Sequence, residues 1–175
     1  MEYIILGLLI IQDCTIYQLN NAFNSGLALI YSSSYGSIQS AIKKLLKAGQ
    51  IGFTETVKNG RNKKIYQINQ AGIDHFYQWM RDDIPLNKLE VVALSKVFFL
   101  GLVESDEEKK KILKGIIQAV TQMESELEQL SGTLSQIELD EESRKIFKYQ
   151  FRTLDYGITA HSCGKEWFQK LLDEL

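Results

Sequence analysis

The chain has 175 residues, of which 45% are hydrophobic and 24% charged, and its net charge is −2 with a pI near 5.8. This composition is that of a folded globular protein; it excludes extensive disorder, three or more domains, and a uniformly basic nucleic-acid-binding chain. The longest apolar run, residues 3–11, has about half the length that a membrane-spanning helix needs, and it lacks the basic flanking residues of a signal peptide. We therefore expect a cytoplasmic protein with no membrane contact.

The first fifty residues predict three helices. The first covers residues 2–12, and the second runs from Ile16 to Phe23 because Thr15 and Gln18 have the spacing of a capping box. A serine cluster (Ser32, Ser33, Ser34) offers N-caps for a third helix of about fourteen residues, which ends at Ala48 with Gly49 in the left-handed cap position. One face of this helix is apolar at helical spacing and is expected to be buried: Ile38, Ala41, Ile42, Leu45 and Leu46.

A β-hairpin and a fourth helix follow. Residues 51–58 and 61–68 are β-prone, and Asn59-Gly60 between them suits a type I′ turn because both residues tolerate positive φ. Asn69 is the expected cap of the fourth helix. The order helix, helix, helix, hairpin, helix is that of a winged helix-turn-helix, which we predict for residues 1–84.

The positive charge of this first part is concentrated in one window. All seven Lys and Arg residues of the first eighty lie between positions 43 and 64, where Glu55 is the only acid, so this window has a net charge of +6. In a winged helix the exposed face of the third helix and the hairpin tip face the same way, which indicates a DNA-binding surface; the bland alternative is a solvated, solubilising face. We expect base-edge contacts from Ser37, Gln39, Ser40 and Lys43, and phosphate or minor-groove contacts from Lys44, Lys47, Lys58, Arg61, Lys63 and Lys64.

The chain's only proline, Pro85, marks the start of the second part, residues 85–175. We predict that this part is a helical dimerisation domain built from long antiparallel helices. The whole fold is therefore expected to be mainly α. An apolar helix is expected over 86–103, an unbroken heptad pattern runs over 113–137, and a final helix over 141–172 has two apolar stripes. The second stripe indicates another subunit, although packing within the chain could also use it. The expected dimerisation residues are Leu113, Ile116, Val120, Met123, Leu127, Leu130, Tyr156 and Trp167.

Catalytic and metal-binding patterns are missing from the sequence. His75 and His161 lack the spacing of a metal or catalytic site, and Cys14 and Cys163 have no C-x-x-C partner, so both are expected to be packed thiols. We therefore predict neither an enzyme nor a cofactor or metal protein.

Several segments, in their order and spacing along the chain, resemble those of the PadR-like transcriptional regulators. They are Ile5 to Leu9, Tyr17, Ser34 to Leu46, Gly49 to Ile51, Lys64 to Ile68 with Gly72, and Thr153 to Gly157 with Trp167. The resemblance implies a cytoplasmic winged-helix homodimer, usually a repressor, with a multi-helix dimerisation domain. The chain departs from the family where Gln39-Ser40 replaces Tyr-Pro and Thr15-Ile16 replaces His-Gly; the first change lies on the helix expected to enter DNA, so the operator need not follow the family's.

The leading functional hypothesis is a dimeric, sequence-specific DNA-binding regulator that reads a pseudo-palindromic operator, acts as a repressor, and is released by a small hydrophobic or aromatic effector. Aromatic residues near the domain junction could line the effector pocket or be ordinary core: Trp79, Phe98, Phe99, Tyr149, Tyr156 and Trp167. The alternative is a helical dimeric protein-interaction module whose winged-helix body does not bind DNA.

Overall fold

The protein is described by a computed structural model that covers residues 1–31, 34–58 and 61–175, without the side chains of Lys58 and Arg61. The chain forms two compact units. The first contains Met1–Asp82 together with Leu94–Phe99, and the second contains Asp83–Ala93 together with Leu100–Leu175. The helix α5 (Leu89–Phe98) therefore contributes residues to both units.

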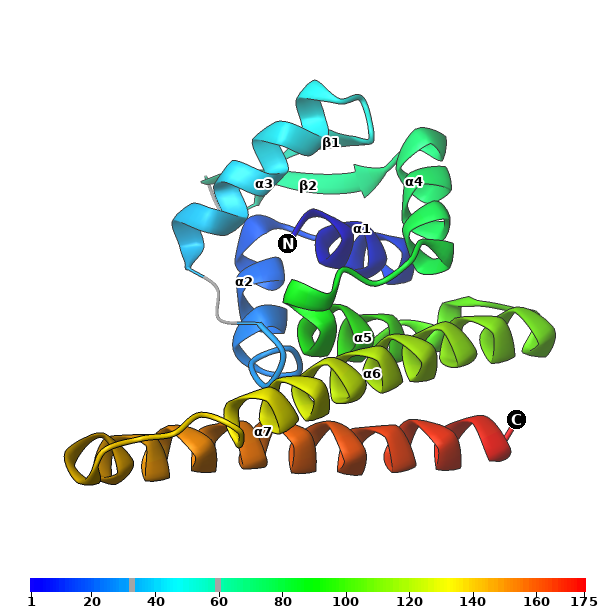
Figure 1. The fold of residues 1–175 in the computed structure, drawn as a ribbon. Helices are drawn as coiled ribbons and strands as arrows, with labels where there is room; N and C mark the ends of the chain where they lie inside the picture. The colour runs from blue at the N-terminus through cyan, green and yellow to red at the C-terminus, as the bar shows by residue number, and fades with distance from the viewer. Residues whose placement is uncertain (32–33, 59–60) are drawn as a thin grey trace. The chain divides into compact units, whose positions relative to one another are not determined.

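The first unit has the predicted winged-helix order (Figure 1). Its elements are α1 (Glu2–Ile11), α2 (Ile16–Asn24), α3 (Tyr35–Lys47), β1 (Ile51–Lys58), β2 (Arg61–Ile68) and α4 (Gln70–Arg81). Capping boxes start two of these helices, Thr15 with Gln18 at α2 and Ser34 with Ser37 at α3, because each side chain bonds a backbone N–H that the first helical turn leaves free. The predicted cap residues Ser32 and Ser33 and the predicted Asn59-Gly60 turn lie outside the described residues.

Two glycines fix the connection between α3, the hairpin and α4. Gly49 has φ +66°, the left-handed conformation that ends α3 as predicted. Gly72 lies against the strand start, since a Cβ on it would be 2.2 Å from the carbonyl oxygen of Gln50. Asn69 is the N-cap residue of α4 as predicted, but its side chain makes no capping hydrogen bond and instead donates to the Gly49 carbonyl at 3.1 Å, which ties the two ends of the hairpin together.

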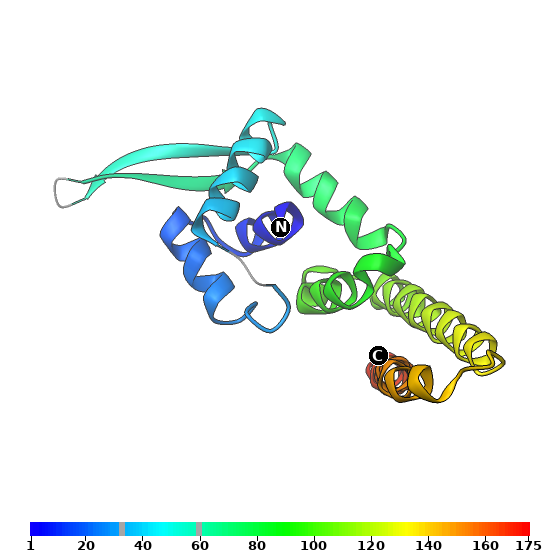
Figure 2. The same ribbon diagram turned by 60° about the vertical axis from the view of Figure 1, so that its left-hand side comes forward.

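The hairpin is an antiparallel pair in register from Ile51–Ile68 to Lys58–Arg61, and Figure 2 shows it projecting beyond α3. Because successive side chains alternate between faces, Phe53, Glu55, Lys64 and Tyr66 share one face while Lys63 lies on the other. At its base Tyr66 exchanges backbone hydrogen bonds with Cys14, which anchors the strand beside the start of α2.

The core of the first unit is formed by the apolar faces of its helices. Fully buried side chains include Leu6, Leu19, Phe23, Ile38 and Phe76. Burying side chains of this size stabilises the fold by about 1.5–3 kcal/mol each. This core holds α3 so that its opposite face is exposed.

The second unit begins less regularly than predicted. The expected single helix over 86–103 is wrong: Leu86–Lys88 and Leu100–Leu102 are short 3-10 turns on either side of α5. Pro85 precedes the first turn and Gly101, a poor helix former, lies in the second, while Leu100 and Val103 turn inward and are buried. The helix α6 (Asp106–Leu134) also ends before Ile137, the last residue of the predicted heptad run.

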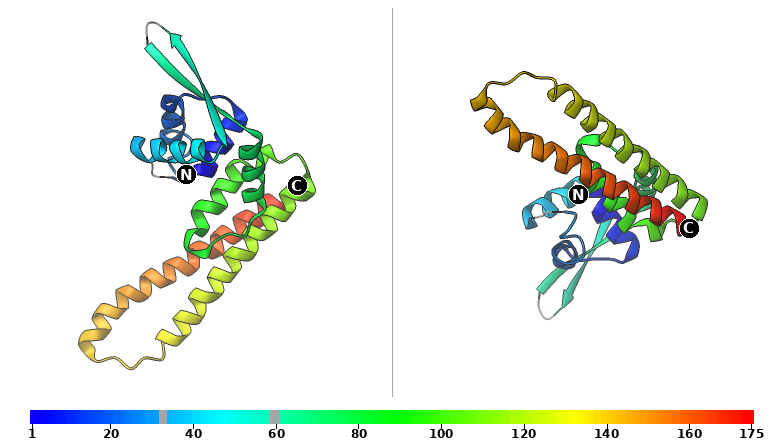
Figure 3. Two further views of the ribbon diagram at one scale, coloured as in Figure 1. Left: turned by 90° about the horizontal axis from the view of Figure 1, so that it is seen from above. Right: turned by 60° about the horizontal axis from the view of Figure 1, so that its bottom comes forward.

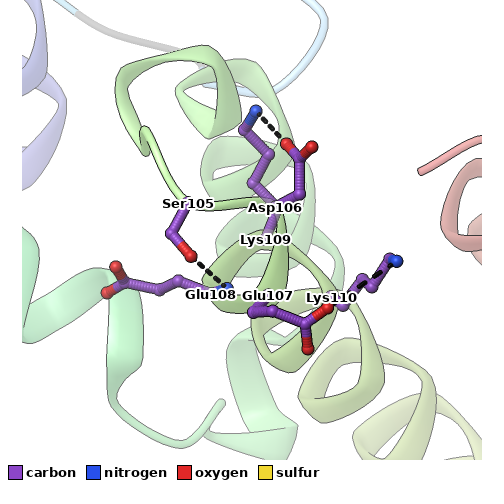
Figure 4. Close-up of polar contacts among 6 residues, drawn as sticks. All are labelled: Ser105, Asp106, Glu107, Glu108, Lys109 and Lys110. Atoms are coloured by element: carbon purple, nitrogen blue, oxygen red, sulfur yellow. Dashed lines mark hydrogen bonds and ion pairs between the residues drawn. The ribbon is translucent and has the colours of Figure 1, made fainter.

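The start of α6 is stabilised by charge and capping (Figure 4). The Ser105 hydroxyl accepts from the Glu108 backbone N–H, and Lys109 and Lys110 lie 2.8 and 3.9 Å from the carboxylates of Asp106 and Glu107. Acidic residues in the first turn stabilise a helix because they interact favourably with the positive end of the helix dipole. The hydrogen bond from Lys109 holds the pKa of Asp106 below its usual value.

The helix α7 (Glu141–Asp173) runs antiparallel beside α6 (Figure 3). Leu127 faces Gly157, and farther along Lys165 donates to the Glu124 carboxylate. One of the two predicted apolar stripes of α7 is half-buried or buried on the side toward α6: Phe147, Phe151, Leu154, Ile158, Phe168 and Leu172. None of the described helices is long and apolar enough to cross a bilayer.

Candidate nucleic-acid interface

A groove of about 540 Å³ lies in the first unit between the start of α2, the exposed face of α3 and strand β2. Three lysines line it, together with hydroxyl and amide groups, and no Asp or Glu is among its lining residues. The lining residues are Thr15, Ile16, Tyr17, Gln39, Ile42, Lys43, Leu46, Asn62, Lys63, Lys64 and Tyr66.

Helical spacing directs Gln39 and Lys43 into this groove. They are four residues apart and both exposed, so they lie one turn apart on the same side of α3. The other side of α3 is fixed by the buried residues Ile38, Ala41 and Leu45. The polar face of α3 is therefore presented in one orientation by the core.

The two hairpin lysines of the groove differ in their surroundings. Lys64 lies 3.4 Å from the Glu55 carboxylate and its ammonium stands 4.1 Å from the centre of the Phe53 ring. Lys63, its neighbour, has no ion-pair partner among the residues that the structure describes, and the same holds for Lys43. Lys43 and Lys63 are thus the cations left to an external anion.

Other predicted DNA-binding residues lie outside the groove. Lys44 pairs with Glu2 of α1 at 3.2 Å. The Ser37 hydroxyl is used within the α3 cap, where it accepts from the Ser34 N–H and donates to the Ser34 carbonyl. Ser40 and Lys47 are exposed on α3. The side chains of Lys58 and Arg61 are outside the described part of the chain.

The groove also contains residues that sequence reasoning did not select: Thr15, Tyr17 and Asn62. Tyr17 is 68% exposed in the first turn of α2, although it is a large aromatic residue. Its hydroxyl, like the backbone N–H groups at a helix start, can donate a hydrogen bond to an anion. The available signal in the sequence was the capping box immediately before it, which places Tyr17 at the positive end of α2.

The groove presents ammonium, hydroxyl and amide groups to solvent. In the described residues no three His, Cys, Asp or Glu side chains come together as a metal site. Of the two predicted packed thiols, Cys14 is buried, and burial raises the pKa of its thiol, which disfavours the reactive thiolate. The prediction was wrong for Cys163, whose position on α7 leaves it exposed. Unpaired ammonium groups beside uncharged hydrogen-bonding side chains suit a polyanion with phosphates and polar edges.

The predicted effector residues fall in different environments. In the first unit Trp79 and Phe99 belong to the core, where Trp79 stacks on Tyr3 at 4.9 Å and Phe99 meets the edge of Phe76, while Phe98 is partly exposed. In the second unit Tyr149, Tyr156 and Trp167 are exposed on α7.

The predicted dimerisation residues are also divided. On α6, Leu113, Ile116 and Val120 are buried within the chain. Burial decreases along this helix, since Met123 and Leu127 are half-buried and Leu130 is exposed. Tyr156 and Trp167 remain exposed on α7. Among the predicted dimerisation residues, the exposed side chains are therefore Leu130 of α6 and Tyr156 and Trp167 of α7.

Comparison with known proteins gave one curated relative and a group of solved structures, while no family model matches the chain. The relative is the negative transcriptional regulator PadR of Bacillus subtilis, 24% identical over 139 residues, which cover 78% of this chain and 74% of the relative. The structure of Bacillus subtilis PadR in complex with operator DNA aligns at a TM-score of 0.48 with 21% identity, and the alignment covers 99% of this chain and 97% of the PadR chain. The structure of the same protein with p-coumaric acid aligns at a TM-score of 0.43 with 20% identity, over 99% of this chain and 96% of the PadR chain.

Proposed function

We propose that this chain is a PadR-like transcriptional regulator and that the groove of its first unit binds double-stranded DNA, with α3 in the major groove and the hairpin beside it. The observation that carries this assignment is the groove's lining of three lysines without a carboxylate. A duplex is a dense line of phosphates, and lysines that neutralise them release condensed counterions, which drives binding.

The roles of the groove residues follow from their positions. Gln39 and Lys43 project from α3 and suit base edges, since Gln can pair with adenine and Lys with guanine; Ser40 lies on the same exposed helix. Lys63 and Lys64 on the hairpin suit phosphates, and we extend this role to Lys47, Lys58 and Arg61. Lys44 is expected to contribute less because Glu2 already pairs with it.

We further propose that the protein acts as a dimer on a pseudo-palindromic operator, since one small head buries little surface on DNA. The relative's description as a negative regulator supports repression. Its structure with p-coumaric acid motivates a small aromatic or hydrophobic effector for this chain as well. Of the aromatic residues predicted to bind it, Trp79 and Phe99 already fill core space, whereas Phe98, Tyr149, Tyr156 and Trp167 retain exposed surface.

The test is DNA binding by the full chain, measured by fluorescence anisotropy at two salt concentrations on fragments selected from genomic DNA. The wild type is expected to lose affinity steeply as salt rises. Lys63→Ala should weaken binding to all fragments and reduce the salt slope by about 1, while Gln39→Ala should change the preference at one base position.

Lys111→Ala is the matched control, because Lys111 is an exposed lysine of α6 in the other unit and its loss removes the same charge. Binding that is absent at low salt, or equal losses in Lys63→Ala and Lys111→Ala, would contradict the assignment. The first result would favour the protein-interaction module instead.

A further inference from the structure

The groove of the first unit changes in character along its length. Ammonium and amide groups are contributed to its lining by Gln39, Lys43, Asn62, Lys63 and Lys64. The remaining lining includes apolar and aromatic side chains: Ile16, Tyr17, Ile42, Leu46 and Tyr66. Phosphate contacts account for the ammonium groups, whereas the apolar lining suits a ligand that also has an apolar body.

The path of the chain separates these two kinds of lining into two ends. Leu46 lies in the last turn of α3, five residues before the hairpin begins at Ile51. On the other wall Tyr66 lies near the base of the hairpin, where it is hydrogen-bonded to Cys14. Lys63 is three residues farther toward the tip, about 10 Å at 3.3 Å per residue. The groove therefore has an apolar end at the base of the hairpin and a cationic end toward its tip.

Three elements enclose the apolar end. Ile42 of α3 and Tyr66 of β2 lie deepest, since they are only 3% and 8% exposed. Ile16 in the first turn of α2 and Leu46 of α3 are half-buried and form the sides. Tyr17 is exposed and adds an aromatic ring to the same lining. A flat apolar body placed here would be covered from more than one side.

The cationic end suits a group with two negative charges. Lys43 and Lys63 have no ion-pair partner among the described residues, and no carboxylate lines the groove. Lys64 pairs with Glu55 over 3.4 Å at the surface, where such a pair contributes little and can exchange. A phosphate monoester has two charges and three acceptor oxygens, so it can pair with two ammonium groups at once.

We propose that this groove binds a small planar aromatic dianion, an aryl phosphate with two fused rings, and that the bound anion excludes DNA. The rings lie at the apolar end and the phosphate lies against Lys43 and Lys63. From Gln39 to Leu46 the groove wall spans seven residues of α3, about 10 Å, which matches the length of such a molecule. The volume of about 540 Å³ is that of a small-molecule site.

The exclusion of DNA rests on the proposed function, because the ligand occupies the same lysines that would hold the duplex. The binding of the anion itself depends only on the lining of the groove. This site is also separate from the aromatic residues proposed for the effector, none of which lines the groove. The two parts of the inference can therefore be measured independently.

The first measurement is calorimetric titration of the full chain with 1-naphthyl phosphate at about pH 8, where a phosphate monoester is doubly charged. We expect a dissociation constant below about 1 mM. Inorganic phosphate lacks the rings and 1-naphthol lacks the charge, so each should bind at least about tenfold more weakly. The proposal is overturned if naphthyl phosphate does not bind, or if either of the two partial ligands binds as tightly.

A matched pair of leucine variants locates the site. Leu46→Asn removes an apolar side and keeps the lysines, so the affinity for naphthyl phosphate should fall about tenfold while the affinity for inorganic phosphate stays unchanged. Leu29→Asn is the control, because Leu29 is 96% exposed and is not among the lining residues. Equal effects of these two variants would overturn the assignment.

Two further variants keep the site testable if Leu46→Asn does not fold. Ile16→Thr shortens the apolar lining at the start of α2 and should weaken naphthyl phosphate about threefold. Lys63→Ala should weaken it about tenfold, and Lys111→Ala, an exposed lysine of α6, should not. If Ile16→Thr and Lys63→Ala both bind naphthyl phosphate as the wild type does, the ligand lies elsewhere and the proposal fails.

The second measurement is competition, followed by fluorescence anisotropy of a labelled DNA fragment at constant ionic strength. Saturating naphthyl phosphate should lower the affinity for DNA at least about fivefold, and inorganic phosphate at the same ionic strength should not. An unchanged affinity for DNA at saturation would overturn the exclusion. Absence of DNA binding by the ligand-free wild type would contradict the proposed function instead, and the calorimetric titration would still decide whether the anion site exists.

Discussion

The groove of the first unit and the exposed apolar stripe of α7, which comprises Ile146, Tyr149, Tyr156, Ala160, Cys163 and Trp167, are opposite in chemistry. In the groove the ammonium groups of Lys43 and Lys63, beside apolar lining residues such as Ile42 and Leu46, are left without an ion-pair partner among the described residues. On α7 the reverse holds: the buried side pairs Lys165 with Glu124, and aromatic side chains are left exposed. Each surface therefore lacks a different kind of partner.

This contrast indicates how the molecule divides its tasks. Unpaired cations at a surface attract a polyanion over several ångströms and depend on salt, whereas an apolar stripe needs close, dry packing against a matching surface. Residues 81–175 have a net charge of −5, which under the proposed function disfavours their contact with a duplex and favours approach through the basic residues 43–64. The two surfaces can be tested separately.

The largest effect is expected at the stripe. Trp167 is exposed on α7 and is predicted to lie at the interface of the proposed dimer; Trp167→Ala should then cost about 2 kcal/mol in each copy, so the dimer dissociation constant should rise about 10³-fold for a combined loss of about 4 kcal/mol. Sedimentation measures it. Gln169→Ala, an exposed change two residues away on another face of α7, should leave the dissociation constant unchanged, and equal effects of the two variants would count against the stripe.

The next effect concerns the ion pair between Glu124 of α6 and Lys165 on the buried side of α7. The hydrogen bond from Lys165 lowers the pKa of Glu124 below 4.5, so its ionised form stabilises the folded state above that pH, and this contribution is lost as the pH falls through the lower, folded value. Glu124→Gln should therefore lower the free energy of unfolding at pH 7 by about 1–2 kcal/mol. Denaturation at pH 7 and pH 3 should show that the difference in unfolding free energy between Glu124→Gln and the wild type becomes smaller at the lower pH. The control Glu128→Gln, at an exposed position one turn later on α6, should show no such difference at either pH.

A smaller effect separates two neighbouring lysines of α3. Lys43→Ala should weaken DNA binding about tenfold because Lys43 lines the groove, and the salt slope should fall by about 1. Lys44→Ala should cost less because Lys44 is paired with Glu2. Anisotropy titrations compare them, and a greater loss in Lys44→Ala would show that DNA meets a different face of α3.

The smallest effect is a gain. Glu55→Gln removes the carboxylate 3.4 Å from Lys64 and should strengthen DNA binding about two- to threefold by freeing that ammonium group. Glu90→Gln changes the net charge equally at an exposed site on α5 and serves as the control. If both variants gained equally, total charge and not the hairpin pair would be responsible.

Much of the local structure was predictable because its causes are local. The capping box at Thr15, the left-handed turn at Gly49 and both strands follow from backbone chemistry within a few residues. The apolar run after Pro85 was harder, because helix periodicity does not show where a chain must turn to bury Leu100 and Val103. The role of Asn69 depended on Gly49, twenty residues earlier, which no local pattern encodes.

The amino-acid sequence by itself determined the order of elements, the family resemblance and the concentration of positive charge between residues 43 and 64. Only the tertiary structure decided which of those cations are free, pairing Lys44 with Glu2 and Lys64 with Glu55 while leaving Lys43 in the groove. It also decided which helix keeps an apolar face, burying Leu113 and Ile116 of α6 while Tyr156 of α7 stays exposed. The physical reason is that periodicity specifies that a face is apolar, whereas the element that covers it is brought there by the rest of the fold.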